Sequence, residues 1–132
     1  MLAKAGALGL GGIYGRDDVG TTRLGRLDAV LIFEALAKAW LMISAYISIH
    51  NMCVWMIDRF GTQVQRQTGC PQLVSLQNRT SYCLTKPGAG SDAGALITQV
   101  ERDGDGWVLN WQKQFISGAG LWRPILPRRA MQ

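Results

Sequence analysis

The hydrophobic pattern of this chain changes its period at one stretch, Tyr82–Asp92, and this change limits the folds open to it. Before the stretch, apolar residues recur at three- or four-residue steps, as on one face of a helix. After it, apolar and polar residues alternate, as in a half-buried strand. We therefore expect an α+β chain, with a helical part followed by the start of an antiparallel β part.

The stretch itself reads YCLTKPGAGSD and joins a predicted short strand to a glycine-rich turn. Tyr82–Leu84 is the strand, Pro87–Gly90 is the turn, and Ser91 and Asp92 are good caps for a helix or turn. Glycine lets a backbone approach a ligand, and consecutive amides in such a turn suit an anionic group. Because glycine-rich turns are common, the residues alone leave a plain interdomain turn as the alternative.

The segment Leu27–Phe60 carries the strongest helical periodicity of the chain. Its apolar positions recur at helical steps: Ile32, Leu36, Trp40, Ile43, Ile47 and Val54. Asp28 can cap its start, and Gly61 follows its last apolar position. A single helix of this length is unusual in a globular domain, so we expect a break near Ser44–Ser48 and two packed helices. His50 is expected to be a satisfied, partly buried side chain rather than a ligand.

The uncharged run Ala39–Ile57 is long enough to be tested as a membrane span. It contains several polar side chains, among them Ser44 and Asn51, which favour a buried core helix. We therefore expect no membrane span, with a small membrane-associated protein as the alternative.

Shorter elements are expected on both sides of this segment. Leu8 and Leu10 close a short N-terminal helix, and residues 15–26 form a polar loop punctuated by glycine. Gln63–Gln67 forms a short helix that ends before Pro71, because the residue before a proline disfavours helical geometry.

The second half of the chain has the pattern of a β-hairpin. Residues 96–101 alternate between apolar and polar, a turn follows at Asp103–Gly106, and Trp107–Leu109 begins the return strand. Gln114–Ser117 is expected to form another strand. Residues 121–132 contain two prolines and no periodicity, which indicates a poorly packed tail.

Composition excludes several classes of protein. The net charge of +5 comes without a run of five basic residues, so nucleic-acid binding is disfavoured. Three cysteines without a CxxC motif do not make a disulfide framework or a zinc site, and a single histidine excludes a His-rich metal site. Motifs such as HExxH, GxSxG and the P-loop are absent from the sequence.

Specific segments of the chain resemble the acyl-CoA dehydrogenases, a family of flavoenzymes. YCLTKPGAGSD is similar to the family signature YCLTEPGSGSD, and FISGAG follows it at the spacing of the second flavin segment. YISIHNMC, WMIDRFG and LDAVLIFEALA resemble the N-terminal helices of the family. IHNMC and FISGAG together resemble the branch that acts on isobutyryl-CoA in valine breakdown. The likeness covers about residues 2–120.

The resemblance implies a domain organisation and an activity. Residues 1–79 would be part of an N-terminal α-helical domain, 80–120 the start of the middle β-domain, and 121–132 a divergent tail. The implied reaction is the FAD-dependent α,β-dehydrogenation of a short branched acyl-CoA, with electrons passed to an electron-transfer flavoprotein. The family also implies a homotetramer and the mitochondrial matrix, and neither nucleic acid nor a metal is implied.

The resemblance also assigns residues to the flavin. On that basis Thr85 lies near the pyrimidine end of the ring, the Ser117 hydroxyl bonds near N5, and Ser91 also touches the acyl-CoA. The full set expected to contact the cofactor is Tyr82, Cys83, Leu84, Thr85, Lys86, Pro87, Gly88, Ala89, Gly90, Ser91, Phe115, Ile116 and Ser117.

Other positions depart from the family pattern. Lys86 stands where the family has glutamate, and Trp111 stands where it usually has glycine. The catalytic glutamate of the family belongs to its C-terminal domain, and neither Glu34 nor Glu101 sits in the matching context. We therefore expect an inactive fragment that arises from splicing, a shifted reading frame or an imperfect gene prediction. The alternative is a non-catalytic helical fragment that binds other subunits or misfolds.

Overall fold

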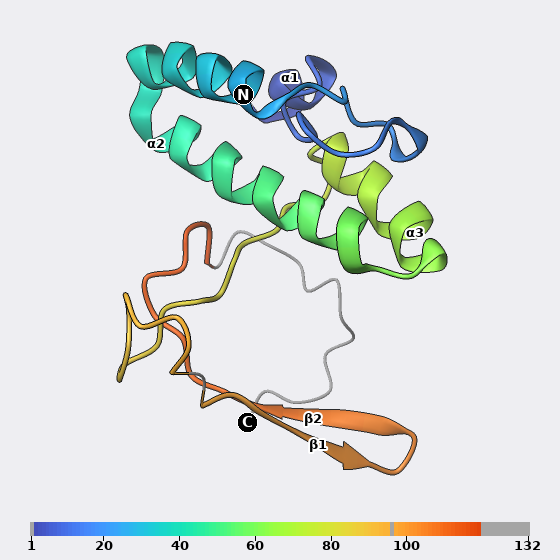
Figure 1. Ribbon diagram of the computed structural model, residues 1–132, viewed down its shortest axis with the longest axis vertical. Coiled ribbons are helices and arrows are strands. Elements are labelled where there is room, and N and C mark those ends of the chain that lie inside the picture. Colours follow the sequence, from blue (N-terminus) through green and yellow to red (C-terminus); the bar gives the residue numbers. More distant parts are fainter. Residues whose placement is uncertain (1, 96, 120–132) are drawn as a thin grey trace. The chain divides into compact units, whose positions relative to one another are not determined.

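The computed structural model describes residues 2–95 and 97–119 of the 132-residue chain (Figure 1). These residues divide into two compact units, 2–82 with 117–119, and 83–95 with 97–116. The first unit is helical and the second contains an antiparallel hairpin, which confirms the predicted α+β class. The predicted domain limits at 79/80 and 120/121 stay predictions, and the predicted tail at 121–132 lies outside the described residues.

The chain begins with helix α1 (Leu2–Ala7), which is the short N-terminal helix expected from the sequence. It ends where Gly9 takes a positive φ of 76°, a conformation that glycine adopts without steric cost. The predicted loop follows and includes one short 3₁₀ turn, η1 (Asp17–Val19). This turn is closed by Gly20, whose φ is 87°.

Helix α2 (Arg26–Phe60) is broken at Trp40, which has the extended backbone angles φ −160° and ψ 97°. Figure 1 shows the two halves of α2 running back alongside each other from this break. The predicted pair of helices is therefore confirmed, but the predicted break at Ser44–Ser48 is wrong. Ser44 instead joins the halves, because its hydroxyl donates to the carbonyl of Phe33 (2.8 Å). Asp28 caps the start from within the first turn by accepting from the Gly25 amide (2.8 Å).

Helix α3 (Gln63–Val74) begins at Gln63, where the short helix was predicted to start, but it continues through Pro71, so the predicted end before this proline is wrong. Thr62 caps its start, since the Thr62 hydroxyl accepts from the Gln65 amide and the Gln65 side chain accepts from the Thr62 amide. A proline inside a helix removes one hydrogen bond and costs about 3 kcal/mol. Burial of Leu73 and Val74 against α2 offsets this cost.

The helical unit has two small apolar clusters that hold its elements together. The first joins α1, both halves of α2 and the turn after α3. Its buried members are Ala5, Ile47 and Leu76, and Leu10, Phe33, Leu36 and Ile43 pack against them. The second joins α2 to α3 through Val54, Leu73 and Val74, with Ile57 alongside. Several of the periodic apolar residues of the sequence therefore make the contacts between helices.

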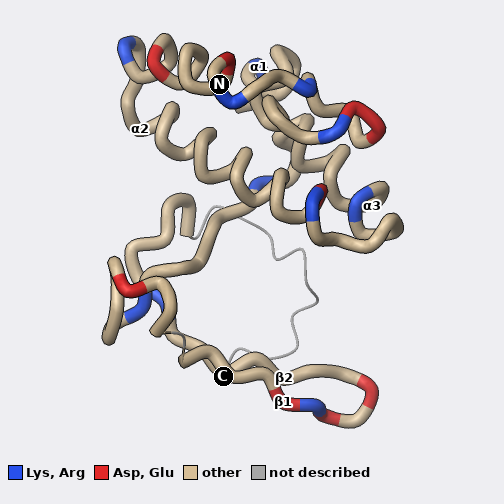
Figure 2. The backbone as a smooth tube through the Cα atoms, viewed as in Figure 1, with Lys and Arg blue, Asp and Glu red and all other residues tan. Residues whose placement is uncertain are grey.

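By length and composition α2 could cross a membrane, but the core helix of a soluble protein passes the same test. Residues 39–57, which include most of the second half of α2, carry no charged side chain (Figure 2). In the helical unit this half packs against α1 and α3, with Ile47, His50 and Val54 buried. Only 11% of the apolar 18-residue stretch that passes this test is buried, so much of α2 stays exposed in this unit.

The second unit contains the predicted β-hairpin. Strand β1 (Gln99–Asp103) pairs antiparallel with β2 (Gly106–Asn110), and the register places Glu101 opposite Val108. The Asp-Gly turn connects the strands, with a φ of 57° at Gly104. Two other predicted strands, Tyr82–Leu84 and Gln114–Ser117, are not strands in the structure.

Candidate functional site

The glycine-rich turn of the second unit is closed by a pair of backbone hydrogen bonds. The amide of Lys86 donates to the carbonyl of Ala89, and the amide of Ala89 donates to that of Lys86, each at 3.1 Å. Pro87 and Gly88 form the tip between them, so the predicted turn is confirmed. A Cβ atom added at Gly88 would meet no atom within 4 Å, which leaves this part of the backbone open to a ligand.

Lys86 is almost completely buried beside this turn, with 1% of its surface exposed. Its ammonium donates to the carbonyl of Asp92 (3.3 Å), and so ties the two ends of the glycine-rich segment together. The sequence indicated only that a positive charge stands where the family carries a negative one. The structure gives that lysine a local role, because a carboxylate could not donate to a carbonyl.

The second unit also brings the two predicted flavin segments side by side. The amide of Gln114 donates to the carbonyl of Thr85 (3.0 Å), and its side-chain amide donates to the carbonyl of Lys86 (3.4 Å). The ammonium of Lys113 donates to the carbonyl of Leu84 (3.4 Å). Residues 83–91 and 115–116, which the resemblance assigns to the cofactor, belong to this unit.

Phe115 marks the point where the second segment leaves the extended conformation. Its φ is 56°, which turns the backbone and explains why Gln114–Ser117 does not continue as a strand. The side chain is 87% exposed. A phenylalanine this open provides apolar surface that a planar ligand can cover.

Tyr82 and Ser117, the remaining predicted flavin residues, belong to the helical unit. The hydroxyl of the adjacent Ser81 donates to the carbonyl of Ser117 and links the two segments there. Gly118 follows with a φ of 80°. A Cβ added at Gly118 would lie 2.6 Å from Cε2 of Tyr46, so the turn is pressed against this ring.

His50 lies in the core of the helical unit with both ring nitrogens engaged. Its Nε2 lies 3.0 Å from the carbonyl of Leu73, and its Nδ1 accepts from the amide of Thr80 (3.3 Å). Burial lowers the pKa of His50 below its usual 6.5, and the Leu73 carbonyl partly opposes this shift. The prediction of a satisfied side chain is confirmed, although the ring is fully rather than partly buried.

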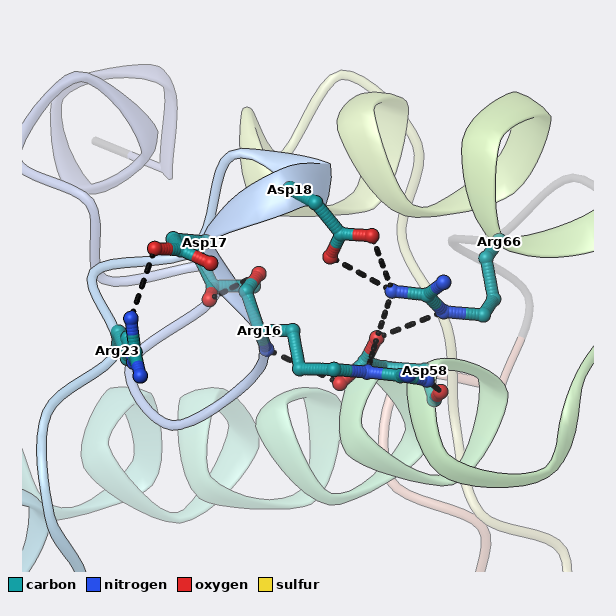
Figure 3. Close-up of polar contacts among 7 residues, drawn as sticks. Arg16, Asp17, Asp18, Arg23, Asp58 and Arg66 are labelled. Carbon is teal, nitrogen blue, oxygen red and sulfur yellow. Dashed lines mark hydrogen bonds and ion pairs between the residues drawn. The ribbon is translucent and has the colours of Figure 1, made fainter. Parts of the chain in front are cut away.

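A network of ion pairs joins the loop around η1, the C-terminal end of α2 and α3 in the helical unit (Figure 3). Asp58 accepts hydrogen bonds from the amide and side chain of Arg16 and from the side chain of Arg66. Arg66 also donates to both carboxylate oxygens of Asp18 (2.7 and 2.8 Å). Sequence reasoning missed this cluster, because the side chains that bond to one another are 8 to 48 positions apart and follow no local pattern.

Among the described residues, neither the glutamates nor the possible metal ligands form a catalytic centre. Glu34 pairs with Lys38 one helical turn away (2.8 Å), and Glu101 is exposed on β1. Both carboxylates are exposed to solvent, so neither lies in the water-excluded surroundings in which a general base usually works. The part of the chain that the structure describes has no group of three His, Cys, Asp or Glu side chains placed to hold a metal ion.

The sequence profiles of two domains match the chain in order. The profile of "Acyl-CoA dehydrogenase, N-terminal domain" matches residues 1–77, and that of "Acyl-CoA dehydrogenase, middle domain" matches residues 81–126. The chain is also similar to mitochondrial isobutyryl-CoA dehydrogenases. It is 54% identical to that of Dictyostelium discoideum over 91% of this chain, and 53% identical to that of Bos taurus over 90%.

The structure of the chain is also similar to solved structures of acyl-CoA dehydrogenases. The acyl-CoA dehydrogenase of Bacillus anthracis, solved in complex with FAD, superposes with a TM-score of 0.76 and 31% identity. That match covers 87% of this chain and 20% of the solved one. The chain spans only 29% of the length of either isobutyryl-CoA dehydrogenase. The matched profiles, the helical and hairpin units and the two joined loop segments show that this chain belongs to the acyl-CoA dehydrogenase family.

Proposed function

We propose that this chain forms part of the flavin site of an acyl-CoA dehydrogenase that acts on a short branched acyl-CoA such as isobutyryl-CoA. Acyl-CoA dehydrogenases are FAD-dependent oxidoreductases. The choice of substrate rests on the similarity to isobutyryl-CoA dehydrogenases, which extends over nine-tenths of this chain. A role in valine breakdown follows from that substrate and is part of the proposal.

One observation carries the proposal, the hydrogen bond from the Gln114 amide to the Thr85 carbonyl (3.0 Å). It joins two segments that are far apart in the sequence and that both resemble flavin-binding segments. The open backbone at Gly88 and the exposed ring of Phe115 lie in the same unit. Exposed amides and an aromatic face suit the polar edge and the planar body of a flavin.

FAD, when bound, supplies the chemistry that accepts a hydride from the substrate. The residues of this chain would bind and orient it. The Thr85 and Ser117 hydroxyls would hydrogen-bond to the ring, with Ser117 near N5, and Phe115 would cover a ring face. The amides of Gly88 and Gly90 would face the polar edge of the cofactor, because those of Lys86 and Ala89 bond to each other. Ser91 would also contact the acyl-CoA.

The described residues hold no carboxylate suited to removing the α-proton of the substrate. Glu34 forms an ion pair with Lys38 at the surface, and Glu101 is exposed to water on the hairpin. General acid–base catalysis contributes about 100- to 10,000-fold, so we expect the chain alone to be inactive or nearly so. A glutamate from elsewhere in a complete enzyme would supply the base.

The partners and location of a complete enzyme are part of the same proposal. They are an acyl-CoA substrate, an electron-transfer flavoprotein as electron acceptor, a homotetrameric assembly and the mitochondrial matrix. The location is supported by the relatives, which are named as mitochondrial proteins.

Flavin content tests the proposal. The 132-residue chain is purified without detergent and incubated with FAD, unbound cofactor is removed, and the visible absorption spectrum is recorded. We expect a retained flavin band that is reduced by Thr85→Val and by Ser117→Ala. Thr98→Val is the matched control, because it removes a similar hydroxyl outside the assigned residues. If no flavin is retained, or if all three variants behave alike, the assignment is wrong.

A second candidate is a non-catalytic product that associates with other subunits. It is favoured by the apolar side chains that α2 leaves exposed around its break, among them Trp40, Leu41 and Met42. Sedimentation of the purified chain, alone and mixed with a full-length isobutyryl-CoA dehydrogenase, separates the two. A complex without retained flavin would favour this candidate over the first.

A further inference from the structure

We propose that Tyr46 and His50 of α2 are positioning residues that set the spacing between the two flavin segments where they meet the helical unit. The inference rests on the proposed function, because it assigns these side chains a role in the same site. Neither Tyr46 nor His50 is among the residues assigned to the substrate or the cofactor. They would act through the backbone at Thr80–Ser81 and at Ser117–Gly118.

The first contact fixes the segment that leads into the glycine-rich turn. The amide of Thr80 donates to Nδ1 of His50 (3.3 Å), so this nitrogen must be unprotonated. The carbonyl of Leu73 lies 3.0 Å from Nε2, so that nitrogen carries the proton. The two bonds select one neutral tautomer of His50. They also fix the backbone at Thr80, two residues before the first predicted flavin residue, Tyr82.

The second contact fixes the turn after the other segment. The edge of the Tyr46 ring stands where a Cβ of residue 118 would be, with only 2.6 Å between them. Gly118 also has a φ of 80°, so this position excludes side chains for two separate reasons. The contact between Gly118 and the Tyr46 ring therefore fixes the distance of the neighbouring residue, Ser117, from α2.

A third contact joins the two anchored segments. The Ser81 hydroxyl donates to the carbonyl of Ser117. This bond joins the segment fixed at Thr80 to the segment fixed at Gly118. Tyr46 and His50 are one helical turn apart, and their ring centroids are separated by 6.4 Å. The two rings therefore form one platform under both segments.

Within the described residues the phenol of Tyr46 is buried without a hydrogen-bond partner. Burial raises the pKa of this phenol, the positive charge of Arg79 lowers it, and Cys53 raises it. Arg79 and Cys53 are the titratable groups that act on Tyr46, and His50 is the other titratable group of the platform. A buried hydroxyl without a partner adds no stability, so the ring rather than the phenol carries the positioning role.

The platform is tested first without flavin, by NMR of the 132-residue chain. We expect the ¹⁵N shifts of His50 to report the neutral Nε2–H tautomer at neutral pH and the Thr80 amide to exchange slowly. Ser81→Ala should shift the Gly118 resonance. Ser48→Ala is the control, because it removes a hydroxyl that bonds only within α2, to Ala45. A charged His50, a rapidly exchanging Thr80 amide or an unmoved Gly118 resonance would overturn the inference.

Flavin affinity is then compared in two glycine variants. Gly118→Ala should weaken FAD binding about tenfold or more, since it displaces Ser117. Gly20→Ala is the control, because Gly20 has a similar φ of 87° but open space around its Cβ position. Equal affinity in the two variants would contradict the positioning role. Absence of FAD binding by the unsubstituted chain would contradict the proposed function instead, and the NMR result would still decide whether the platform exists.

Discussion

Arg66 and Asp58 form a buried ion pair that joins α3 to the end of α2. Arg66 Nη2 lies 2.9 Å from Asp58 Oδ1, and the side chains are 9% and 5% exposed. Asp58 accepts further bonds from Arg16, and Arg66 donates to Asp18, so neither charge is left without a partner (Figure 3). A buried carboxylate with several donors is costly to disturb, because removing it leaves its partners uncompensated.

Asp58→Ala should therefore destabilise the helical unit by about 3 kcal/mol. Asp17→Ala is the control, since Asp17 pairs with Arg23 at the surface, where such pairs contribute about 0–1 kcal/mol. Chemical denaturation followed by circular dichroism measures both values. Equal destabilisation by the two variants would show that the buried network does not hold the helices together.

The same carboxylate predicts a loss of stability in acid. Burial alone would raise the pKa of Asp58, but hydrogen bonds from Arg16 and Arg66 outweigh it and lower the pKa below its usual 3.8. The folded state then binds the proton less readily than the unfolded state, so this stabilisation is present above pH 3.8 and is lost as the pH falls through the folded pKa. Acid titration of the free energy of unfolding should be shallower in Asp58→Asn.

His50 predicts a second pH dependence at a higher pH. Its folded pKa is lowered below 6.5, so the unfolded chain takes up the proton first as the pH falls. Stability should fall below pH 6.5 until the folded pKa is reached, with a slope of at most about 1.4 kcal/mol per pH unit. His50 is the single histidine of the chain. His50→Gln should therefore remove this slope, and a slope that persists would assign it to other groups.

Two helical glycines should respond oppositely to alanine. A Cβ at Gly6 would lie 2.1 Å from the carbonyl oxygen of Ser75, so Gly6→Ala should destabilise the helical unit by about 2 kcal/mol. Gly69 lies in α3 with no atom within 4 Å of its Cβ position. Gly69→Ala should stabilise by about 0.5–1 kcal/mol, because alanine is the better helix former. Melting temperatures of both variants test the packing of α1 on the end of α3.

Thiol labelling should distinguish the cysteines. Cys70 is fully buried and Cys83 is half-buried. Burial raises the pKa of both thiols, and the positive charge of Lys113 partly opposes the shift at Cys83. Cys83 should react first with an aromatic disulfide reagent at neutral pH, and Cys83→Ser should remove this phase. Slower labelling in the presence of FAD would support the flavin assignment, whereas a faster Cys70 would contradict the fold of the helical unit.

Much of the fold could be predicted because it depends on neighbours in the chain. The apolar period of Leu27–Phe60, the Asp-Gly turn after β1 and the glycine-rich turn at Pro87–Gly88 are local signals, and each was confirmed. Of the candidate site, the sequence suggested which segments contact the flavin but not the bond from Gln114 to Thr85. No pattern of spacing reveals a backbone contact between segments 29 positions apart.

The sequence alone determined where helices give way to a hairpin, because side-chain periodicity is imposed by each element on its own residues. Only the tertiary structure decided that α2 breaks at Trp40, that α3 continues through Pro71 and that Asp58 lies buried between two arginines. Each of these outcomes is set by packing against a distant segment. The free energy of such contacts exceeds local preference by a few kcal/mol, which is enough to move an element boundary or bury a charge.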